Sequence, residues 1–279
     1  MSLARLDIPT LLRKHGLHAK KGLGQNFLLD EDVLRQITAC AEIPAGATVL
    51  EIGPGLGNLT RHLARAARRV VAVELDGALL PVLDEVLKGY TNVSGVQGDI
   101  LQIDLARLDL EPGYQVVANI PYYITSAVIR RLLEAPVQPS RITLTVQKEV
   151  AQRLCALPGE LSLLALSVQV YGQPRLALTV PAEAFYPAPT VDSAVVRIDL
   201  YPQPRIPAGH LDVFFTLIKA GFSQKRKTLR NALSGGLAWP PEKAAALLQS
   251  AAIDPQRRAE TISIEEWGVL VESFAGFKK

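Results

Sequence analysis

The first two-thirds of the chain alternates short apolar runs with segments whose apolar residues recur at helical spacing. The runs TVLEIG (48–53) and RVVAVEL (69–75) are rich in β-branched residues and predict buried strands. The segments that follow them, LTRHLARAA (59–67) and ALLPVLDEVL (78–87), predict helices. Buried strands that alternate with helices are typical of an α/β fold with a parallel sheet covered on both faces.

The pattern changes toward the end of this region. The apolar runs 164–172 and 174–181 follow each other so closely that we expect a hairpin, which would give the sheet an antiparallel strand at its edge. A proline-rich segment at 201–210 comes next, and beyond it only helical patterns occur. We therefore predict two domains: residues 1–204, an α/β domain with a basic N-terminal segment, and residues 205–279, a small all-α domain.

Composition excludes several classes of protein. Hydrophobic residues make up 48% of the 279 positions and charged residues 20%, as in ordinary globular proteins. No apolar stretch is long enough for a membrane span, and the N-terminus lacks the pattern of a signal peptide. The two cysteines and four histidines form neither a disulfide framework nor a zinc-binding spacing. We therefore expect a cytoplasmic protein that binds no metal. We also expect it to be a monomer.

The distribution of charge says more than the net charge of +3. Two stretches contain basic residues and no acid. Between Asp7 and Asp30 lie Arg13, Lys14, Lys20 and Lys21, and between Asp212 and Glu242 lie Lys219, Lys225, Arg226, Lys227 and Arg230. Such stretches indicate a polyanionic partner, although two solvated surfaces would give the same pattern. We expect residues 225–230 to begin a helix that places Arg226 and Arg230 on one face.

A glycine-rich loop, GPGLG (53–57), stands between a predicted strand and a predicted helix. Its glycines let the backbone turn sharply and approach a ligand closely. Glu74 ends the next strand, where a carboxylate can accept hydrogen bonds from ribose hydroxyls. Pro54 removes a backbone N–H that a phosphate-binding loop would use, so the pattern favours a nucleoside without a pyrophosphate. A purely structural turn is the alternative.

Two further candidates follow later strands. Asp99 comes at the end of the third strand, where it can accept from the amine of a base or, alternatively, cap a turn. NIPY (119–122) follows the strand YQVVANI and supplies an amide oxygen at Asn119, a rigid turn at Pro121 and an aromatic face at Tyr122. This set suits the binding of a planar base that carries an amino group, although an ordinary proline turn is also possible.

These motifs, with several others in the same order, resemble the ribosomal RNA adenine N6-dimethyltransferases, and within them the enzymes of the small ribosomal subunit. The matching segments are KKGLGQNFL (20–28), EIGPGLGNLT (51–60), NIPYYIT (119–125), VQKEVAQR (146–153), FYPAPTVDSAV (185–195) and FSQKRKTLRNAL (222–233). The resemblance implies a class I, Rossmann-like methyltransferase sheet that binds S-adenosylmethionine. It also implies dimethylation of two adjacent adenosines in the 3′-terminal hairpin loop of small-subunit (16S) ribosomal RNA, within the ribosomal particle.

The resemblance also assigns roles to individual residues. In the cofactor site, Asn26 and Leu28 would border the cofactor, Gly53 would lie against its methionine part, Glu74 would hold its ribose and Asp99 its adenine amine. In the catalytic site, Asn119 would sit between the cofactor and the target base, and Tyr122 and Phe185 would stack on the flipped adenine.

Three other functions remain open from the sequence. Ile120 stands where leucine is common in the small-subunit enzymes and isoleucine is typical of large-subunit methyltransferases that confer macrolide resistance. A non-catalytic RNA-binding assembly factor could keep the same fold. A nicotinamide-dependent oxidoreductase could use a glycine loop, although GPGLG and NIPY disfavour it.

Overall fold

The computed structural model describes residues 3–277, which group into two compact units. The first unit contains the chain up to Ala151 together with Pro174–Leu200, and the second contains Gln152–Gln173 and the chain from Tyr201. This division differs from the expected boundary at 204/205 mainly because residues 152–173 group with the helical unit. The reason is that helix α7 (Leu163–Gln169) packs against helix α8 (Leu211–Gly221).

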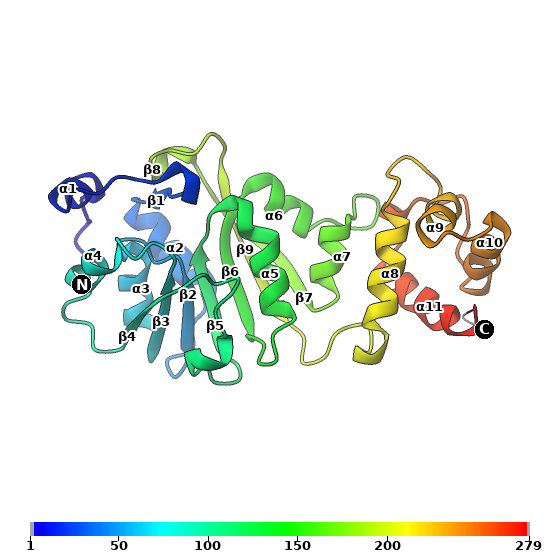
Figure 1. Cartoon of the computed structure of the whole chain (residues 1–279), viewed down its shortest axis with the longest axis horizontal. Helices are drawn as coiled ribbons and strands as arrows, with labels where there is room; N and C mark the ends of the chain where they lie inside the picture. Colours follow the sequence, from blue (N-terminus) through cyan, green and yellow to red (C-terminus); the bar gives the residue numbers. More distant parts are fainter. Residues whose placement is uncertain (1–2, 278–279) are drawn as a thin grey trace. The chain divides into compact units, whose positions relative to one another are not determined.

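The first unit is built on a seven-stranded sheet with the strand order β4-β3-β2-β5-β6-β9-β7 (Figure 1). The strands are β2 (Thr48–Ile52), β3 (Arg69–Glu74), β4 (Val93–Gln97), β5 (Gln115–Asn119), β6 (Arg141–Gln147), β7 (Gly172–Val180) and β9 (Ser193–Leu200). Strands β2 to β6 pair in parallel, and β9 pairs antiparallel with β6. This mixed sheet confirms the predicted α/β class. Its β2, β3 and β5 strands are almost wholly buried, as their continuous apolar runs require.

The helices of this unit, apart from the N-terminal α1, connect the strands. They are α1 (Ile8–Lys14), α2 (Glu31–Ala41), α3 (Asn58–Ala66), α4 (Leu80–Val86), α5 (Thr125–Leu133) and α6 (Lys148–Leu154), which continues into the second unit. A separate two-stranded ladder joins β1 (Phe27–Leu28) to β8 (Phe185–Tyr186). The short 3-10 helices of this unit are η1 (Lys21–Leu23), η2 (Leu105–Leu108), η3 (Tyr122–Ile124) and η4 (Ala182–Ala184), and those of the second unit are η5 (Ala208–His210), η6 (Ala259–Thr261) and η7 (Ala275–Phe277). Within residues 3–277, no helix is long and apolar enough to cross a membrane.

The expected hairpin of 164–172 with 174–181 is wrong. Most of the first run is helix α7, whose start is capped by Ser162, since the Ser162 side chain accepts a hydrogen bond from the Ala165 N–H at 3.1 Å. A short apolar run fits a buried strand and a buried helix equally well, so its periodicity could not decide between them. The antiparallel strand next to β6 is β9, which follows β8 in the chain.

Beyond residue 210 the α-helices of the second unit, as described through residue 277, number four, which confirms the expected helical patterns. They are α8, α9 (Leu229–Leu237), α10 (Pro241–Ser250) and α11 (Ile264–Phe274). Trp267 is completely buried among them. Helices α8 and α9 cross closely, because a Cβ on Gly236 would lie 2.5 Å from Ala220 Cα.

The expected helix start at 225–230 needs correction. Thr228 is the N-cap of α9, and its side chain accepts from the Asn231 N–H. Lys225, Arg226 and Lys227 therefore lie in the exposed turn before the helix. Arg226 and Arg230 do not share a helical face, because threonine favours the N-cap position over the helix interior.

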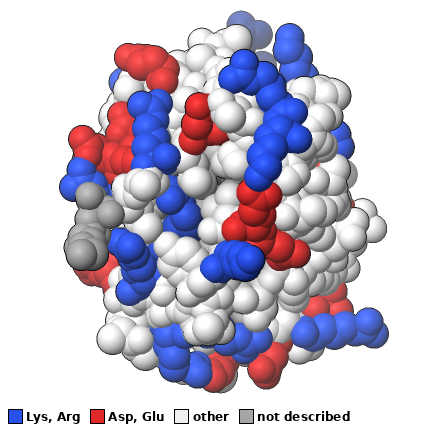
Figure 2. Space-filling view, turned by 90° about the vertical axis from the view of Figure 1, so that its left-hand side faces the viewer, with Lys and Arg blue, Asp and Glu red and all other residues white. Residues whose placement is uncertain are grey.

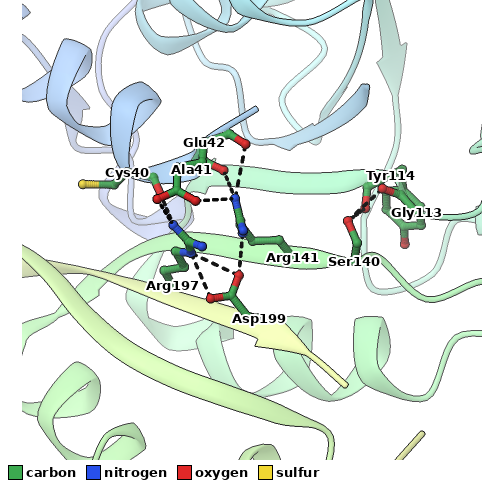
Figure 3. A network of polar contacts seen from close by, with 9 residues as sticks. All are labelled: Cys40, Ala41, Glu42, Gly113, Tyr114, Ser140, Arg141, Arg197 and Asp199. Atoms are coloured by element: carbon green, nitrogen blue, oxygen red, sulfur yellow. Dashed lines mark hydrogen bonds and ion pairs between the residues drawn. The ribbon is translucent and has the colours of Figure 1, made fainter. Parts of the chain in front are cut away.

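A network of charged side chains fixes the C-terminus of α2 to the sheet (Figure 3). Arg141 of β6 and Arg197 of β9 both donate to Asp199, with Nε–Oδ1 distances of 2.6 and 3.1 Å. The same two arginines donate to the carbonyl oxygens of Ala41 and Cys40, at 2.7 and 3.2 Å, which are otherwise unpaired at the end of a helix. The network lies at the amino end of β6, away from the carboxyl ends of the parallel strands.

Candidate active site

A cavity of about 220 Å³ opens at the carboxyl ends of strands β2, β3 and β5. The carboxyl edge of an open α/β sheet is where ligands bind in such folds. Seven of the eight predicted site residues line this cavity: Asn26, Leu28, Gly53, Glu74, Asp99, Asn119 and Tyr122. Phe185 is not among the lining residues. The structure therefore brings together residues that are far apart in the sequence.

The glycine-rich loop forms one wall of the cavity, and its backbone has the conformation that glycine allows. Gly53, Gly55 and Gly57 have φ angles of 68°, 58° and 88°, which side-chain-bearing residues rarely adopt. A Cβ on Gly55 would lie 3.0 Å from the ring of Phe27, so the loop packs tightly beneath β1. Gly57 is the N-cap of α3, so the loop leads directly into this helix.

Glu74 is buried, with 6% of its surface exposed, and it ties the glycine loop to β3. Its Oε2 accepts from the Gly55 N–H at 3.0 Å, and its Oε1 accepts from the Asp76 N–H at 2.8 Å. Burial raises the pKa of this carboxyl above its usual value, against the lowering effect of these backbone hydrogen bonds. The contact with ribose stays a prediction.

Asp99 has the capping role that the sequence offered as an alternative, and it also lines the cavity. Its Oδ1 accepts from the Leu101 N–H at 2.9 Å, and its Oδ2 accepts from Gln102 Nε2 at 2.8 Å. The turn after β4 is thereby held in place. Recognition of an adenine amine by Asp99 stays a prediction.

Asn119 ends β5 and carries an amide whose orientation is set by a distant segment. Its Nδ2 donates to the carbonyl oxygen of Asn26 at 3.1 Å. Because the NH₂ group is engaged there, the side-chain oxygen is left to accept a hydrogen bond from another group. Asn26 itself is held by a weaker contact from its Nδ2 to the Gly24 carbonyl at 3.4 Å.

Tyr122 is half-buried in the cavity wall, and its hydroxyl lies 2.6 Å from Ser193 Oγ. Burial raises the pKa of the phenol, and the hydrogen bond with Ser193 opposes this. Ser193 belongs to the same FYPAPTVDSAV segment as Phe185. This contact anchors the aromatic ring at one edge.

Phe185 is placed differently from the other predicted residues. It lies on β8, opposite Leu28 of β1, and only 4% of its surface is exposed. Its ring belongs to an apolar cluster that includes Leu28, Leu34 and Val195. Phe185 thus supports the segment that borders the cavity, and its stacking on a base stays a prediction.

Two functional candidates were missed by the sequence analysis, and both lie on the cavity wall. Glu51 is 1% exposed, and burial, together with the nearby charge of Glu74, raises its pKa to about 8. Its Oε2 has no hydrogen-bond partner among the described residues, and neither has Asn58 Oδ1. The available signal was an acid inside the apolar strand TVLEI, immediately before the glycine loop. Both oxygens lie on the cavity wall and are free to accept a hydrogen bond from a bound ligand.

The comparisons with known proteins identify the family of the chain. The family model described as "Ribosomal RNA adenine dimethylase" matches residues 16–276. A protein named "Ribosomal RNA small subunit methyltransferase A" from Dehalococcoides mccartyi (strain CBDB1) is 48% identical over 268 residues, which is 95% of this chain and 92% of that protein. A protein of the same name from Alkaliphilus oremlandii (strain OhILAs) is 41% identical over 272 residues, covering 95% of each.

Solved structures show the same relationship. The 23S rRNA methyltransferase ErmE superposes with a TM-score of 0.72 at 29% identity, covering 90% of this chain and all of that chain (100%). A dimethyladenosine transferase from Plasmodium falciparum superposes with a TM-score of 0.76 at 25% identity, covering 90% and 98%. The resemblance indicated by the sequence motifs is confirmed. The chain belongs to the ribosomal RNA adenine dimethylase family.

Proposed function

We propose that this enzyme transfers methyl groups from S-adenosylmethionine to N6 of two adjacent adenosines in the 3′-terminal hairpin loop of small-subunit ribosomal RNA. The observation that carries the proposal is the oriented amide of Asn119 beside Tyr122, in the same cavity as Glu51 and Glu74. Family membership supports the chemistry, and relatives at 40–48% identity that are named small-subunit methyltransferases support the substrate. We further propose that it acts as a cytoplasmic monomer on the small-subunit particle.

The cavity suits the proposed cofactor. S-adenosylmethionine supplies a methyl group on a positively charged sulfur. The wall carries two buried acids, Glu51 and Glu74, and the unpartnered Oε2 of Glu51 offers an acceptor to a cationic ligand. We assign the ribose to Glu74, the adenine amine to Asp99, the methionine part to Gly53, and the border of the cofactor to Asn26 and Leu28.

Asn119 would promote the reaction by hydrogen bonding. The lone pair of an adenine N6 amine is delocalised into the ring, so the amine becomes nucleophilic as its nitrogen turns pyramidal. The Asn119 side-chain oxygen and the backbone carbonyl of Ile120 or Pro121 would accept its two N–H hydrogens and stabilise that geometry. Asn119 would hold the amine rather than deprotonate it, because a neutral amide is not a base at neutral pH.

Tyr122 would hold the flipped base by stacking. A base extruded from a loop costs less free energy than one taken from a duplex, which suits a hairpin-loop target. The Ser193 contact fixes the Tyr122 ring, so little side-chain entropy is lost when the base binds. Phe185 would contribute a second aromatic face after a local rearrangement, since its ring is buried in this structure.

The RNA backbone would be held mainly by the exposed turn Lys225–Lys227. No ion pair among residues 3–277 involves these three side chains, whereas Lys14 and Lys20 pair with Glu85 and Asp76. Figure 2 shows that the side of the molecule carrying α1 and α4 has basic side chains interspersed with acidic ones. That face is therefore less suited to continuous phosphate binding than an acid-free turn.

The other functions considered are not favoured. The two relatives described above, at 41–48% identity, carry the small-subunit name, whereas the large-subunit enzyme ErmE is 29% identical. A non-catalytic assembly factor would have no need to keep the glycine loop, Glu74, Asp99 and Asn119 together in one cavity.

The test is methyl transfer from labelled S-adenosylmethionine to purified ribosomal particles. We expect incorporation into unmethylated small-subunit particles. Small-subunit particles that already carry the modification serve as the matched control and should take up no label. Preferential labelling of large-subunit particles would contradict the proposed substrate, and labelling of neither would contradict the proposed activity.

A further inference from the structure

The segment Lys20–Asn26 is a closed loop that lies beside the cavity. The Lys20 backbone N–H donates to Gln25 Oε1 at 2.8 Å, and the 3-10 turn η1 between these residues ends at Gly24, with a φ of 62°. A Cβ on Gly24 would lie 3.0 Å from Pro121 Cβ, so the loop is packed against the NIPY turn. The position of this loop therefore affects the catalytic end of the cavity.

Asp76 connects this loop to the strand that carries Glu74. Its carboxylate is 6% exposed and accepts from Lys20 Nζ at 2.8 Å, from Gln25 Nε2 at 3.0 Å and from the Ala78 N–H at 3.2 Å. Its own backbone N–H donates to Glu74 Oε1 at 2.8 Å. One residue thus contacts the acid assigned to the cofactor on one side and the loop on the other.

The remaining link runs from the loop to Asn119. Gln25 precedes Asn26, whose carbonyl oxygen accepts from Asn119 Nδ2 at 3.1 Å. If the loop moved by an ångström, this hydrogen bond would be lost, and either end of the amide could face the cavity. Hydrogen bonds thus connect Asp76 to the loop and the loop to Asn119.

We propose that Asp76 is a positioning residue for methyl transfer, which holds the Lys20–Asn26 loop so that Asn26 turns the Asn119 amide oxygen toward the reacting amine. Asp76 touches neither the base nor the methyl group in this proposal. The inference rests on the function proposed above. Charge-assisted hydrogen bonds to a buried carboxylate are strong enough for this role, and Lys20 would serve the loop rather than the RNA.

The test uses Asp76→Asn, Lys20→Met and the double variant in the full-length protein. Asparagine keeps an acceptor for the Ala78 N–H and leaves the backbone contact to Glu74, so the fold of the turn is preserved. Glu85→Gln is the matched control. Glu85, on α4, pairs with Lys14 and with His15 at 3.1 Å, so it also holds the N-terminal segment of the chain, but it does not line the cavity.

We expect Asp76→Asn to lower the single-turnover rate of methyl transfer about tenfold at saturating cofactor and RNA, the effect of one lost charge-assisted hydrogen bond. The double variant should be no slower than Asp76→Asn, because both changes remove the same interaction. Glu85→Gln should keep the wild-type rate. A wild-type rate in Asp76→Asn, or effects that multiply in the double variant, would overturn the proposal.

Hydrogen–deuterium exchange of residues 21–26 tests the same proposal without catalysis. Exchange should be faster in Asp76→Asn and Lys20→Met than in the wild type and Glu85→Gln. Unchanged exchange in all variants would overturn the role of Asp76. If the wild type transferred no methyl group to any particle, the proposed function would fail, while the exchange result would still decide whether Asp76 holds the loop.

Discussion

The charged side chains at the two ends of the parallel strands are arranged in opposite ways. At the amino end of β6, Arg141 and Arg197 are paired with Asp199 and Glu42, and every charge has an opposite neighbour (Figure 3). At the carboxyl ends, Glu51 and Glu74 are buried next to each other and take part in no ion pair among the described residues. The first arrangement is complete without a ligand, whereas the second leaves two buried acids with raised pKa values, whose charged forms a bound cation would stabilise.

This difference separates residues that stabilise the fold from residues that serve the reaction. Changes at the paired end are expected to alter the free energy of unfolding and leave binding intact. Changes at the cavity end are expected to alter binding or catalysis, and in one case to increase stability, as expected for buried groups kept for function.

The largest effect is expected for Asn119→Ala. Loss of the amide oxygen should lower the methyl-transfer rate about a hundredfold or more, because the contact strengthens as the N6 nitrogen becomes pyramidal. The affinity for the RNA particle and the thermal stability should change little. Single-turnover kinetics with a parallel binding assay measure both, and a variant with the wild-type rate would remove Asn119 from the mechanism.

Asp199→Ala should act on stability alone. Removing the acid leaves two half-buried arginines without it, and we expect a loss of roughly 2–3 kcal/mol in the free energy of unfolding, somewhat less than for a fully buried pair. Burial alone raises the pKa of Asp199, but hydrogen bonds from Arg197 and Arg141 outweigh it and lower the pKa. Because the pKa of Asp199 is lower in the folded state, its charge stabilises the folded protein at pH values above the unfolded pKa of about 4. The difference in unfolding free energy between variant and wild type should therefore shrink as the pH falls below about 4. Denaturant unfolding across this pH range checks the prediction, and a difference that grew in acid would refute it.

Glu51→Gln should stabilise the protein at alkaline pH. Burial raises the folded pKa of Glu51 to about 8, above the unfolded value of about 4.3. The wild type therefore loses stability as the pH rises from the unfolded toward the folded pKa, because only the unfolded chain releases the proton there. Glutamine has no such proton, so the gap between the two stabilities should widen from pH 5 to 8. If the difference in unfolding free energy between Glu51→Gln and the wild type were the same at every pH, Glu51 would not be buried as a neutral acid.

The smallest effect is expected for the exposed turn. Changing Arg226 and Lys227 to glutamate should weaken binding to the small-subunit particle and reduce the slope of log affinity against log salt by roughly one unit per lost phosphate contact. The charge-matched pair Lys88→Glu and Arg107→Glu, on the first unit, should leave the slope unchanged. Equal slopes in both double variants would show that the turn is only a solvated surface.

The sequence predicted the parallel strands of the sheet where local pattern and topology agree, and it placed several candidate residues at one edge of that sheet. The strands that carry Gly53, Glu74, Asp99 and Asn119 are parallel, so residues at their carboxyl ends must meet at one edge. Thr228 illustrates a local signal that was available and misjudged: a threonine before an apolar helix is a common N-cap, so the basic residues before it lie outside the helix.

Other features depend on contacts that a sequence does not encode locally. The contact of Asp76 with Lys20 joins residues 56 positions apart, and its existence depends on how the N-terminal loop lies over β3. The burial of Phe185 depends on the ladder between β1 and β8, two strands of only two residues each. Strands this short have no periodicity from which to predict them.

Calorimetric titration of S-adenosylmethionine into the wild type, Glu74→Ala and Asp199→Ala tests most directly whether the cavity-end acids bind the cofactor. Removal of a charge-assisted contact to ribose from Glu74 should weaken the affinity by about tenfold or more. The Asp199→Ala protein, measured well below its unfolding temperature, should bind the cofactor as the wild type does. Unchanged affinity in Glu74→Ala, or an equal loss in both variants, would contradict the account.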